Sequence, residues 1–176
     1  MPSYGADQIY KFGDSNVDTL TSEIELEGPG GVDVVDGFTA IADFYNHQII
    51  TFDGSNWNSF GGKGKANREM HYPTDILIEN EKLWVADAYN NRIQVFDLKG
   101  KQLLTFGDEL GMNAATGIYV TTDEVYITDF ENSRVFIFDH EGNVIETIET
   151  GLDKPTDVFL HEEELLVINY QGKYIS

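Results

Sequence analysis

The fold is decided by residues 83–97, which read Leu83-Trp84-Val85-Ala86-Asp87-Ala88-Tyr89-Asn90-Asn91-Arg92-Ile93-Gln94-Val95-Phe96-Asp97. Related copies occupy residues 38–53 and 125–139, and a partial copy occupies residues 165–170. The residue that takes the place of Asp87 in each copy is the anchor of that repeat. These anchors follow one another at 40, 44, 42 and 40 residues, and they are Ser3, Asp43, Asp87, Asp129 and Asn169. A fixed period of this length predicts a repeat architecture.

Each repeat carries signals for four short strands. An opening strand follows a proline in residues 73–78 and 155–160, with looser copies at residues 29–32 and 115–118, and proline is tolerated at the start of a strand. The second strand is nearly all apolar up to the anchor, as a strand covered on both faces should be. The third strand ends in an Asp and a glycine turn, and a fourth strand follows it at residues 101–106 and 144–148. Four antiparallel strands in every ~40–45 residues predict the blade of a β-propeller, and we expect one all-β domain over residues 1–176.

The anchor segments also resemble a known family. Residues 43–49 and 87–97 resemble NHL repeats, whose pattern is valine-alanine-Asp, a short turn with Asn-His or Asn-Asn, and then Arg-Ile-Gln-Val-Phe. The resemblance extends over essentially the whole chain and is most specific in the second repeat. It implies a β-propeller, which in that family usually has six blades and sometimes five.

The chain is four repeats long, and its two ends divide one repeat between them. The beginning supplies the third and fourth strands of a blade, and the end supplies the first and second. Because open sheet edges pair with whatever complements them, we expect residues 7–12 to pair with residues 164–168 and to close a four-bladed ring. The alternatives are head-to-tail pairing between chains, which gives a homo-oligomer, and a fragment of a larger propeller.

Composition narrows the classes of function. The chain has 31 acidic and 11 basic residues and a formal charge of −20, which repels phosphate backbones and argues against a nucleic-acid partner. It has no cysteine, so it makes no disulfide and no thiolate-bound metal site. No apolar run is long enough to cross a membrane and no signal peptide is visible, so we expect no membrane partner and a cytoplasmic location by default.

Two rows of carboxylates are candidates for a cation site. The anchors Asp43, Asp87 and Asp129 come where a turn begins, and we expect them to accept backbone N–H groups in that turn. The opening strands carry Asp75 and Asp157, which in a ring would face the mouth of the central channel and could hold a divalent cation such as calcium. The glycines at the equivalent positions of the other two repeats interrupt that ring of ligands, so no cofactor is required.

A basic loop is the candidate contact patch for a partner. It stands out because basic residues are few, and its residues are Trp57, Lys63, Lys65, Arg68 and Tyr72. The four histidines, at positions 47, 71, 140 and 161, lie at different places in the repeat, so we expect no shared zinc site. The best interpretation is a non-catalytic binding or scaffold propeller that holds a protein partner or a small ligand with the loops at one end of the ring. The alternatives are a metal-assisted lyase or hydrolase at the central channel and a module that assembles by strand exchange.

Overall fold

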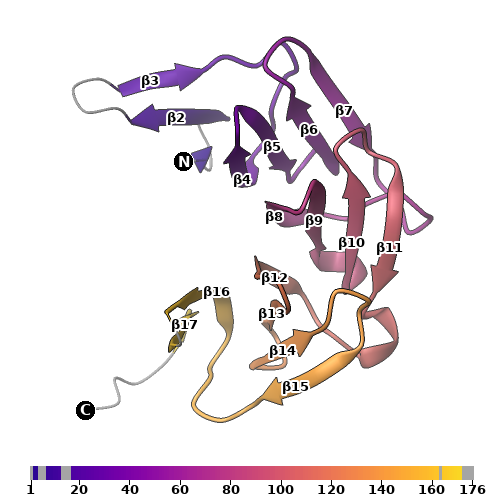
Figure 1. The fold of residues 1–176 in the computed structure, drawn as a ribbon, viewed down its shortest axis with the longest axis vertical. Helices are drawn as coiled ribbons and strands as arrows, with labels where there is room; N and C mark the ends of the chain where they lie inside the picture. Colours follow the sequence, from indigo (N-terminus) through magenta and orange to yellow (C-terminus); the bar gives the residue numbers. More distant parts are fainter. Residues whose placement is uncertain (1, 4–6, 13–16, 163, 172–176) are drawn as a thin grey trace.

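The protein is a curved row of antiparallel sheets that stand side by side around a common axis (Figure 1). This computed structural model describes residues 2–3, 7–12, 17–162 and 164–171. Three sheets are complete four-stranded blades, an incomplete three-stranded sheet precedes them, and an incomplete two-stranded sheet follows them. The predicted all-β propeller architecture is confirmed.

The strands follow the sequence repeats in order. Blade 1 contains β4 (Pro29–Val35), β5 (Phe38–Asp43), β6 (Gln48–Phe52) and β7 (Trp57–Gly61). Blade 2 contains β8 (Pro73–Glu79), β9 (Lys82–Asp87), β10 (Arg92–Asp97) and β11 (Gln102–Phe106). Blade 3 contains β12 (Ala115–Val120), β13 (Val125–Asp129), β14 (Arg134–Phe138) and β15 (Val144–Ile148). The ends contain β1 (Pro2–Ser3), β2 (Gln8–Phe12), β3 (Val17–Leu20), β16 (Pro155–His161) and β17 (Glu164–Asn169).

Helical structure is confined to two short loops in the described part of the chain. Both are 3₁₀ turns of three residues, η1 (Ala88–Asn90) and η2 (Asp108–Leu110). In the segments that the structure describes, no helix has the length and the apolar character needed to cross a membrane.

The expected closure of the ring is not shown. Among the described residues, β2 pairs with β1 and β3, and β17 pairs with β16 alone. The two incomplete sheets form the two ends of the arc in Figure 1 and are not joined by any described strand pairing.

Apolar side chains fill the space between successive blades. Blade 1 packs against blade 2 through residues such as Ala42, Ile49 and Val85, each fully buried. Blade 2 packs against blade 3 through a larger cluster that includes Trp84 and Phe138. Burial stabilises by about 25 cal/mol for each Å² of apolar surface, so the contacts between blades are the main source of stability. A blade without a neighbour on one side therefore exposes apolar surface there.

The anchors form the most regular polar feature of the fold. The carboxylates of Asp43, Asp87 and Asp129 are inaccessible to solvent. One oxygen of each accepts a backbone N–H at 2.7 Å from a residue 16 positions earlier, in the loop that leads into the same blade. The expected structural role is confirmed, but the donor was predicted wrongly. It lies in the loop before the blade, because the second strand ends beside the segment that enters the opening strand.

The second anchor oxygen binds side chains of the turn and of the third strand. Asp87 accepts hydrogen bonds from Asn90 at 2.9 Å, Arg92 Nε at 2.8 Å and Gln94 Nε2 at 2.9 Å. Arg92 also donates to three loop carbonyls, those of Lys65, Ala66 and Glu69. The buried ion pair thus fastens the third strand and the basic loop to the end of β9.

Replacement of Asp87 by alanine should destabilise the protein strongly. It leaves the guanidinium of Arg92, which is 8% exposed, without its counter-ion, and breaking a buried pair in this way costs about 3–5 kcal/mol. Chemical denaturation of Asp87→Ala would measure the loss in the free energy of unfolding. Glu149→Ala, an exposed carboxylate on blade 3, is the control and should change it by less than about 0.5 kcal/mol. Equal stability of the two variants would contradict the assigned role.

Candidate functional site

The inner strands hold the carboxylates that were considered for a cation. Asp75 lies on β8 and Asp157 on β16, and β12 stands between these two strands. Asp75 accepts the N–H of Ile76 at 2.9 Å and the N–H of Ile118 on β12 at 3.0 Å, and Asp157 accepts the N–H of Val158 at 2.8 Å. The described residues contain no group of three or more His, Asp or Glu side chains placed to hold a metal ion. Cation binding by this pair stays a prediction.

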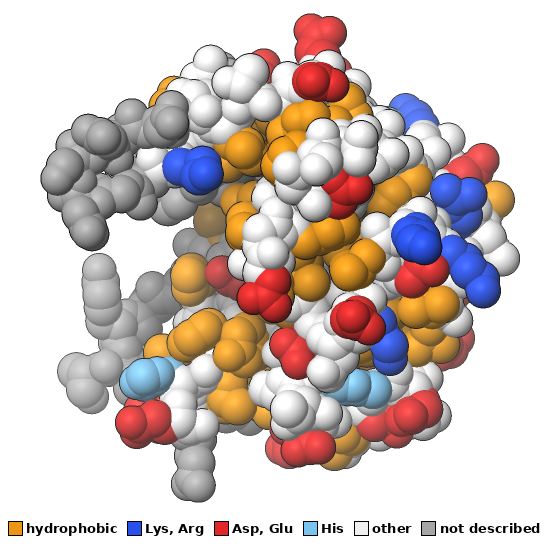
Figure 2. All heavy atoms as spheres, turned by 45° about the horizontal axis from the view of Figure 1, so that its top comes forward, with side chains coloured by type: hydrophobic (Ala, Val, Ile, Leu, Met, Phe, Trp, Pro, Cys, Tyr) orange, Lys and Arg blue, Asp and Glu red, His pale blue; other side chains and the backbone are white. Residues whose placement is uncertain are grey.

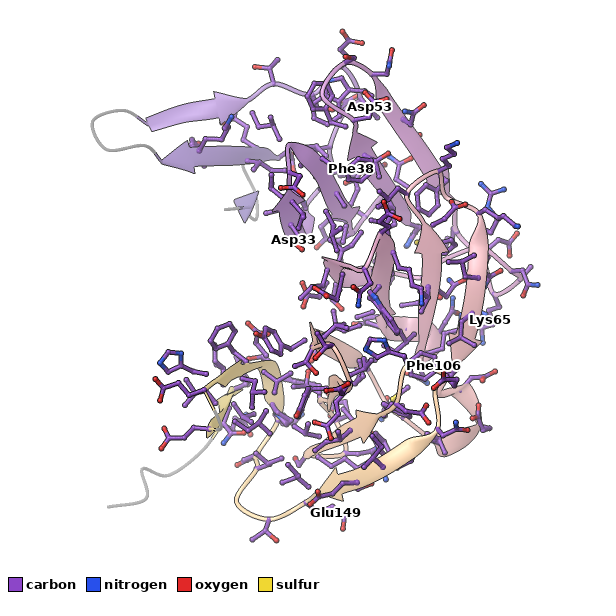
Figure 3. The ribbon with its side chains drawn as sticks, viewed as in Figure 1. Asp33, Phe38, Asp53, Lys65, Phe106 and Glu149 are labelled. Carbon is purple, nitrogen blue, oxygen red and sulfur yellow. The ribbon has the colours of Figure 1, made fainter. Side chains whose placement is uncertain are left out.

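Desolvation raises the pKa of Asp75 to about 7. The N–H of Ile118 opposes this shift by stabilising the ionised carboxylate, and the negative charge of Asp157 reinforces it. Asp33 of β4 makes a similar contact between blades and accepts the N–H of Ile78 at 2.8 Å (Figure 3). Asp33 and Asp75 therefore each join their own inner strand to that of the next blade.

The glycines at the equivalent positions of the other two repeats leave space for Asp75 and Asp157 on the neighbouring strands. A Cβ on Gly31 would lie 2.6 Å from Oδ1 of Asp75, and a Cβ on Gly117 would lie 2.8 Å from the Cα of Asp157. No larger residue fits at either position without movement of the neighbouring inner strand. The alternation of Gly and Asp therefore reflects close packing near the axis.

The residues of the predicted basic patch do not gather at one point. Trp57 begins β7 and packs on Phe52 at 4.8 Å between ring centres, whereas the basic loop follows the opposite end of that strand. Lys65 lies at the outer edge of the molecule (Figure 3), and Figure 2 shows Lys and Arg side chains gathered on one side. Lys63, Lys65 and Arg68 are exposed, and Tyr72 is turned into a separate aromatic cluster.

The side of the molecule at which the second strands end is built from two kinds of loop. The turns after the second strands meet the loops that lead into the opening strands, and we call this end the loop face. Backbone hydrogen bonds join the two in each blade, as in Tyr45 N–H to the Glu27 carbonyl and Tyr89 N–H to the His71 carbonyl, both at 3.0 Å. The loop face is therefore fixed by the same segments that satisfy the anchors.

A repeated side-chain clasp locks each blade to the next at the loop face. The residue four positions after an anchor accepts the N–H of the residue just before the next opening strand, at 2.7–3.1 Å. Both members have positive φ angles, between 50° and 64°. Non-glycine residues seldom adopt this conformation, so the surrounding contacts must hold them there. The pairs are Asp7–Gly28, His47–Tyr72, Asn91–Ala114 and Ser133–Lys154.

An aromatic cluster surrounds the second clasp. The ring of Tyr72 lies 4.4 Å from His47, 4.7 Å from Phe44 and 5.0 Å from Tyr89, measured between ring centres. Tyr45 and Tyr89 form its solvent side, with exposed fractions of 45% and 58%. Because tyrosine offers a large rigid contact area with a polar end, it is enriched at interfaces. We call Phe44, Tyr45, His47, His71, Tyr72 and Tyr89 the aromatic cluster.

This cluster brings together two histidines that occupy different places in the repeat. The rings of His47 and His71 lie 5.4 Å apart, although they come from different blades. His140 is elsewhere, against Trp84 at 5.2 Å between ring centres. Burial lowers the pKa of His47, and the charges of His71 and Lys63 lower it further. A neutral ring is what the clasp requires, since Nδ1 of His47 accepts the Tyr72 N–H.

An acidic pocket adjoins the aromatic cluster. It encloses about 650 Å³ and is lined by Asp7, Glu25 and Glu27 together with Asn46 and the apolar Ile24 and Leu26. All three carboxylates are exposed, and the described residues that line the pocket include no Lys or Arg. The two features share one turn, because Tyr45 binds the Glu27 carbonyl and Asn46 donates to the Glu25 carbonyl at 3.4 Å. The loop face thus presents aromatic rings beside three exposed carboxylates.

The sequence contained a partial signal for this site. An aromatic residue follows each anchor within two positions, as in Tyr45, Tyr89, Phe130 and Tyr170. The acidic pocket had no such signal, since its residues come from several separate segments: the residue before β2, the segment between β3 and β4, the turn after β5 and the start of β6.

Comparison with known proteins supports the fold. The pattern described as NHL repeat matches residues 70–96 and 112–138, which confirms the resemblance at these two repeats. Among curated proteins, Protein SUPPRESSOR OF QUENCHING 1, chloroplastic, of Arabidopsis thaliana is 33% identical over 107 residues. That match covers 54% of this chain and 10% of the plant protein.

Solved structures of similar shape are β-propellers. Virginiamycin B lyase from Staphylococcus aureus, solved with quinupristin, is 14% identical and has a TM-score of 0.70 over 94% of this chain and 64% of the lyase chain. The computationally designed Ika4 protein is 11% identical and has a TM-score of 0.70 over 87% of this chain and 92% of its own. At these identities the likeness establishes the fold alone.

The clasp of His47 should make stability depend on pH. The folded state lowers the pKa of His47 below its usual 6.5, so the native protein binds a proton at His47 less readily than the unfolded chain does. The contribution of neutral His47 to the free energy of unfolding is therefore complete above pH 6.5 and declines as the pH falls below 6.5. His47→Asn keeps an acceptor, as Asn91 does in the next blade, and should remove this decline. His47→Ala leaves the Tyr72 N–H unpaired and should cost about 1–3 kcal/mol at neutral pH. Unfolding curves of the three proteins between pH 5 and 8 test this, and parallel profiles for wild type and His47→Asn would refute it.

Proposed function

We propose that the protein is a non-catalytic binding module that holds a basic peptide segment of a protein partner on its loop face. The observation that carries the proposal is the acidic pocket beside the exposed rings of Tyr45 and Tyr89. A Lys or Arg side chain placed there would meet carboxylates and the faces of aromatic rings, both of which attract cations.

Rigidity of the loop face supports this function. The clasps and anchors hold the backbone on both sides of the aromatic cluster, so little conformational entropy would be lost on binding. The net charge of −20 further favours a cationic partner, because it raises the rate of encounter with positive segments. The binding energy would concentrate at the tyrosines, which are frequent hot spots of interfaces.

A peptide-display selection against the whole chain tests the proposal. We expect selected peptides to be rich in Lys and Arg and to lose at least about tenfold in affinity for Tyr45→Ala and Tyr89→Ala, a change of ~1.4 kcal/mol. Leu103→Ala, which removes an exposed apolar side chain from β11, is the matched control and should bind as wild type does. Peptides that bind the tyrosine variants and wild type equally would disprove the proposed site.

The acidic pocket is tested by charge removal at constant size. Glu25→Gln with Glu27→Gln should weaken binding of the same peptides and reduce its dependence on salt, because fewer charges attract the ligand. Glu141→Gln with Glu149→Gln removes the same charge from exposed positions of blade 3 and is the control. A similar effect of both pairs would show that net charge, rather than the pocket, governs binding.

A further inference from the structure

A second pocket lies between blade 1 and blade 2, on the side opposite to the loop face. It encloses about 360 Å³ and is lined by residues of β5, β6 and β7, by the hairpin between β10 and β11, and by Arg68 of the connecting loop. Phe38 begins β5, whose other end is the anchor Asp43, and Phe38 and Asp53 mark the pocket on blade 1 in Figure 3. Both blades that form it are complete. We call it the hairpin pocket.

The floor of the hairpin pocket is apolar. Phe38, Phe60 and Leu98 line it and pack against the core between blade 1 and blade 2. The ring of Phe60 also lies 4.9 Å from that of the fully buried Phe96, measured between ring centres. Because sites for small molecules are mostly apolar with a few placed polar groups, this floor suits the hydrocarbon part of a ligand.

Polar residues form the walls of the hairpin pocket where the next pair of blades has apolar ones. Thr51 of β6 lies opposite Asn58 of β7, and the equivalent pair in blade 2 is Val95 and Leu104. Val95 and Leu104 pack in the core between blade 2 and blade 3. A space lined by hydrogen-bonding groups therefore takes the place of an apolar contact.

The hydroxyl of Thr51 is available to a ligand. Thr51 is only 3% exposed, and within the described segments its side chain makes no hydrogen bond. Buried polar groups nearly always have a partner, so a buried hydroxyl without one on the wall of a pocket points to a ligand. The equivalent Val95 shows that the repeat itself requires no hydroxyl at this position.

Two positive charges line the same pocket. Arg68 lies 19 residues before the anchor Asp87, and Leu110 lies 19 residues before the anchor Asp129. Leu110 packs on the core between blades 2 and 3, whereas Arg68 and Lys99 line the hairpin pocket. Neither Arg68 nor Lys99 forms an ion pair with a described residue. Both are therefore free to form charge-assisted hydrogen bonds with an anion.

One carboxylate also lines the hairpin pocket, and it is engaged by its own turn. Oδ1 of Asp53 accepts the N–H groups of Ser55 at 2.9 Å and of Asn56 at 2.7 Å. The equivalent residues Asp97 and Asp139 bind the backbone of their own hairpins in the same way. Asp53 thus has the role that is common to all three blades, and the two cations outnumber it.

We propose that the hairpin pocket binds a small organic acid. Its carboxylate meets Arg68 and Lys99, its apolar body rests on Phe38 and Phe60, and Thr51 supplies a hydrogen bond. The net charge of the chain does not prevent this, because charges more than about 8 Å away are largely screened at physiological ionic strength. The site is independent of the proposed function, since it lies on the opposite side of the molecule and selects the opposite charge.

Two probes of equal size and different charge test the proposal. Phenylacetate carries the carboxylate, and phenylacetamide is its neutral counterpart. In NMR titrations of the whole chain we expect phenylacetate to bind with a dissociation constant of about 1 mM, which a molecule of this size can reach. Phenylacetamide should bind at least about fivefold more weakly, because it offers no charge to Arg68 and Lys99. Equal affinity for the two probes, or no binding of phenylacetate, would overturn the proposal.

Charge-matched variants locate the bound carboxylate. Arg68→Gln with Lys99→Gln should weaken phenylacetate binding about tenfold, through the loss of two ion pairs. Lys65→Gln with Lys101→Gln is the control, since these exposed lysines belong to the same loop and the same hairpin but do not line the pocket. An equal loss in both double variants would place the anion elsewhere and refute the site.

Filling the pocket gives a test in which the fold is retained. Thr51→Val with Asn58→Leu reproduces the Val95 and Leu104 pair of blade 2. We expect this variant to lose phenylacetate binding and to melt at or above the temperature of wild type, because it removes an unpaired buried hydroxyl and adds apolar contact. Binding as tight as that of wild type would contradict the proposal.

Discussion

The whole architecture depends on a carboxylate buried at the end of the second strand of each blade. Asp43, Asp87 and Asp129 are completely withdrawn from water, and a buried charge is tolerated only if its hydrogen bonds are satisfied. Each one draws a backbone N–H from the loop before its blade and side chains from the turn and the third strand after it. Two loops distant in sequence are thereby brought to one place, and the loop face follows from this requirement.

The clasps extend the same constraint from one blade to the next. An anchor orders the loops of its own blade, and the residue four positions later reaches the backbone of the following blade. Because the acceptor is an imidazole in one clasp and an amide, carboxylate or hydroxyl in the others, the geometry is conserved by the backbone while the chemistry varies. Aromatic rings also surround the clasp of His47, and for this reason this part of the loop face differs from the rest.

Much of the fold was predictable because the period of the repeat is encoded in local pattern. The anchors and glycine turns located the strands, and Asp97 and Asp139 located the hairpins. The site was less predictable, because its contacts join residues 21–25 positions apart through left-handed backbone at residues such as Tyr72 and Lys154. No propensity favours that conformation for these residue types, so only the folded structure reveals it. The expected convergence of Trp57 with the basic loop failed to form because β7 separates them.

The sheet that precedes blade 1 contributes to the loop face through Asp7. Asp7 directly precedes β2 and both lines the acidic pocket and clasps Gly28 of blade 1 at 2.7 Å. Whatever strand pairs with β2 therefore also sets the position of one wall of the pocket. The first sheet and the acidic pocket are thus coupled through Asp7, because one side chain both lines the pocket and binds the backbone that enters blade 1.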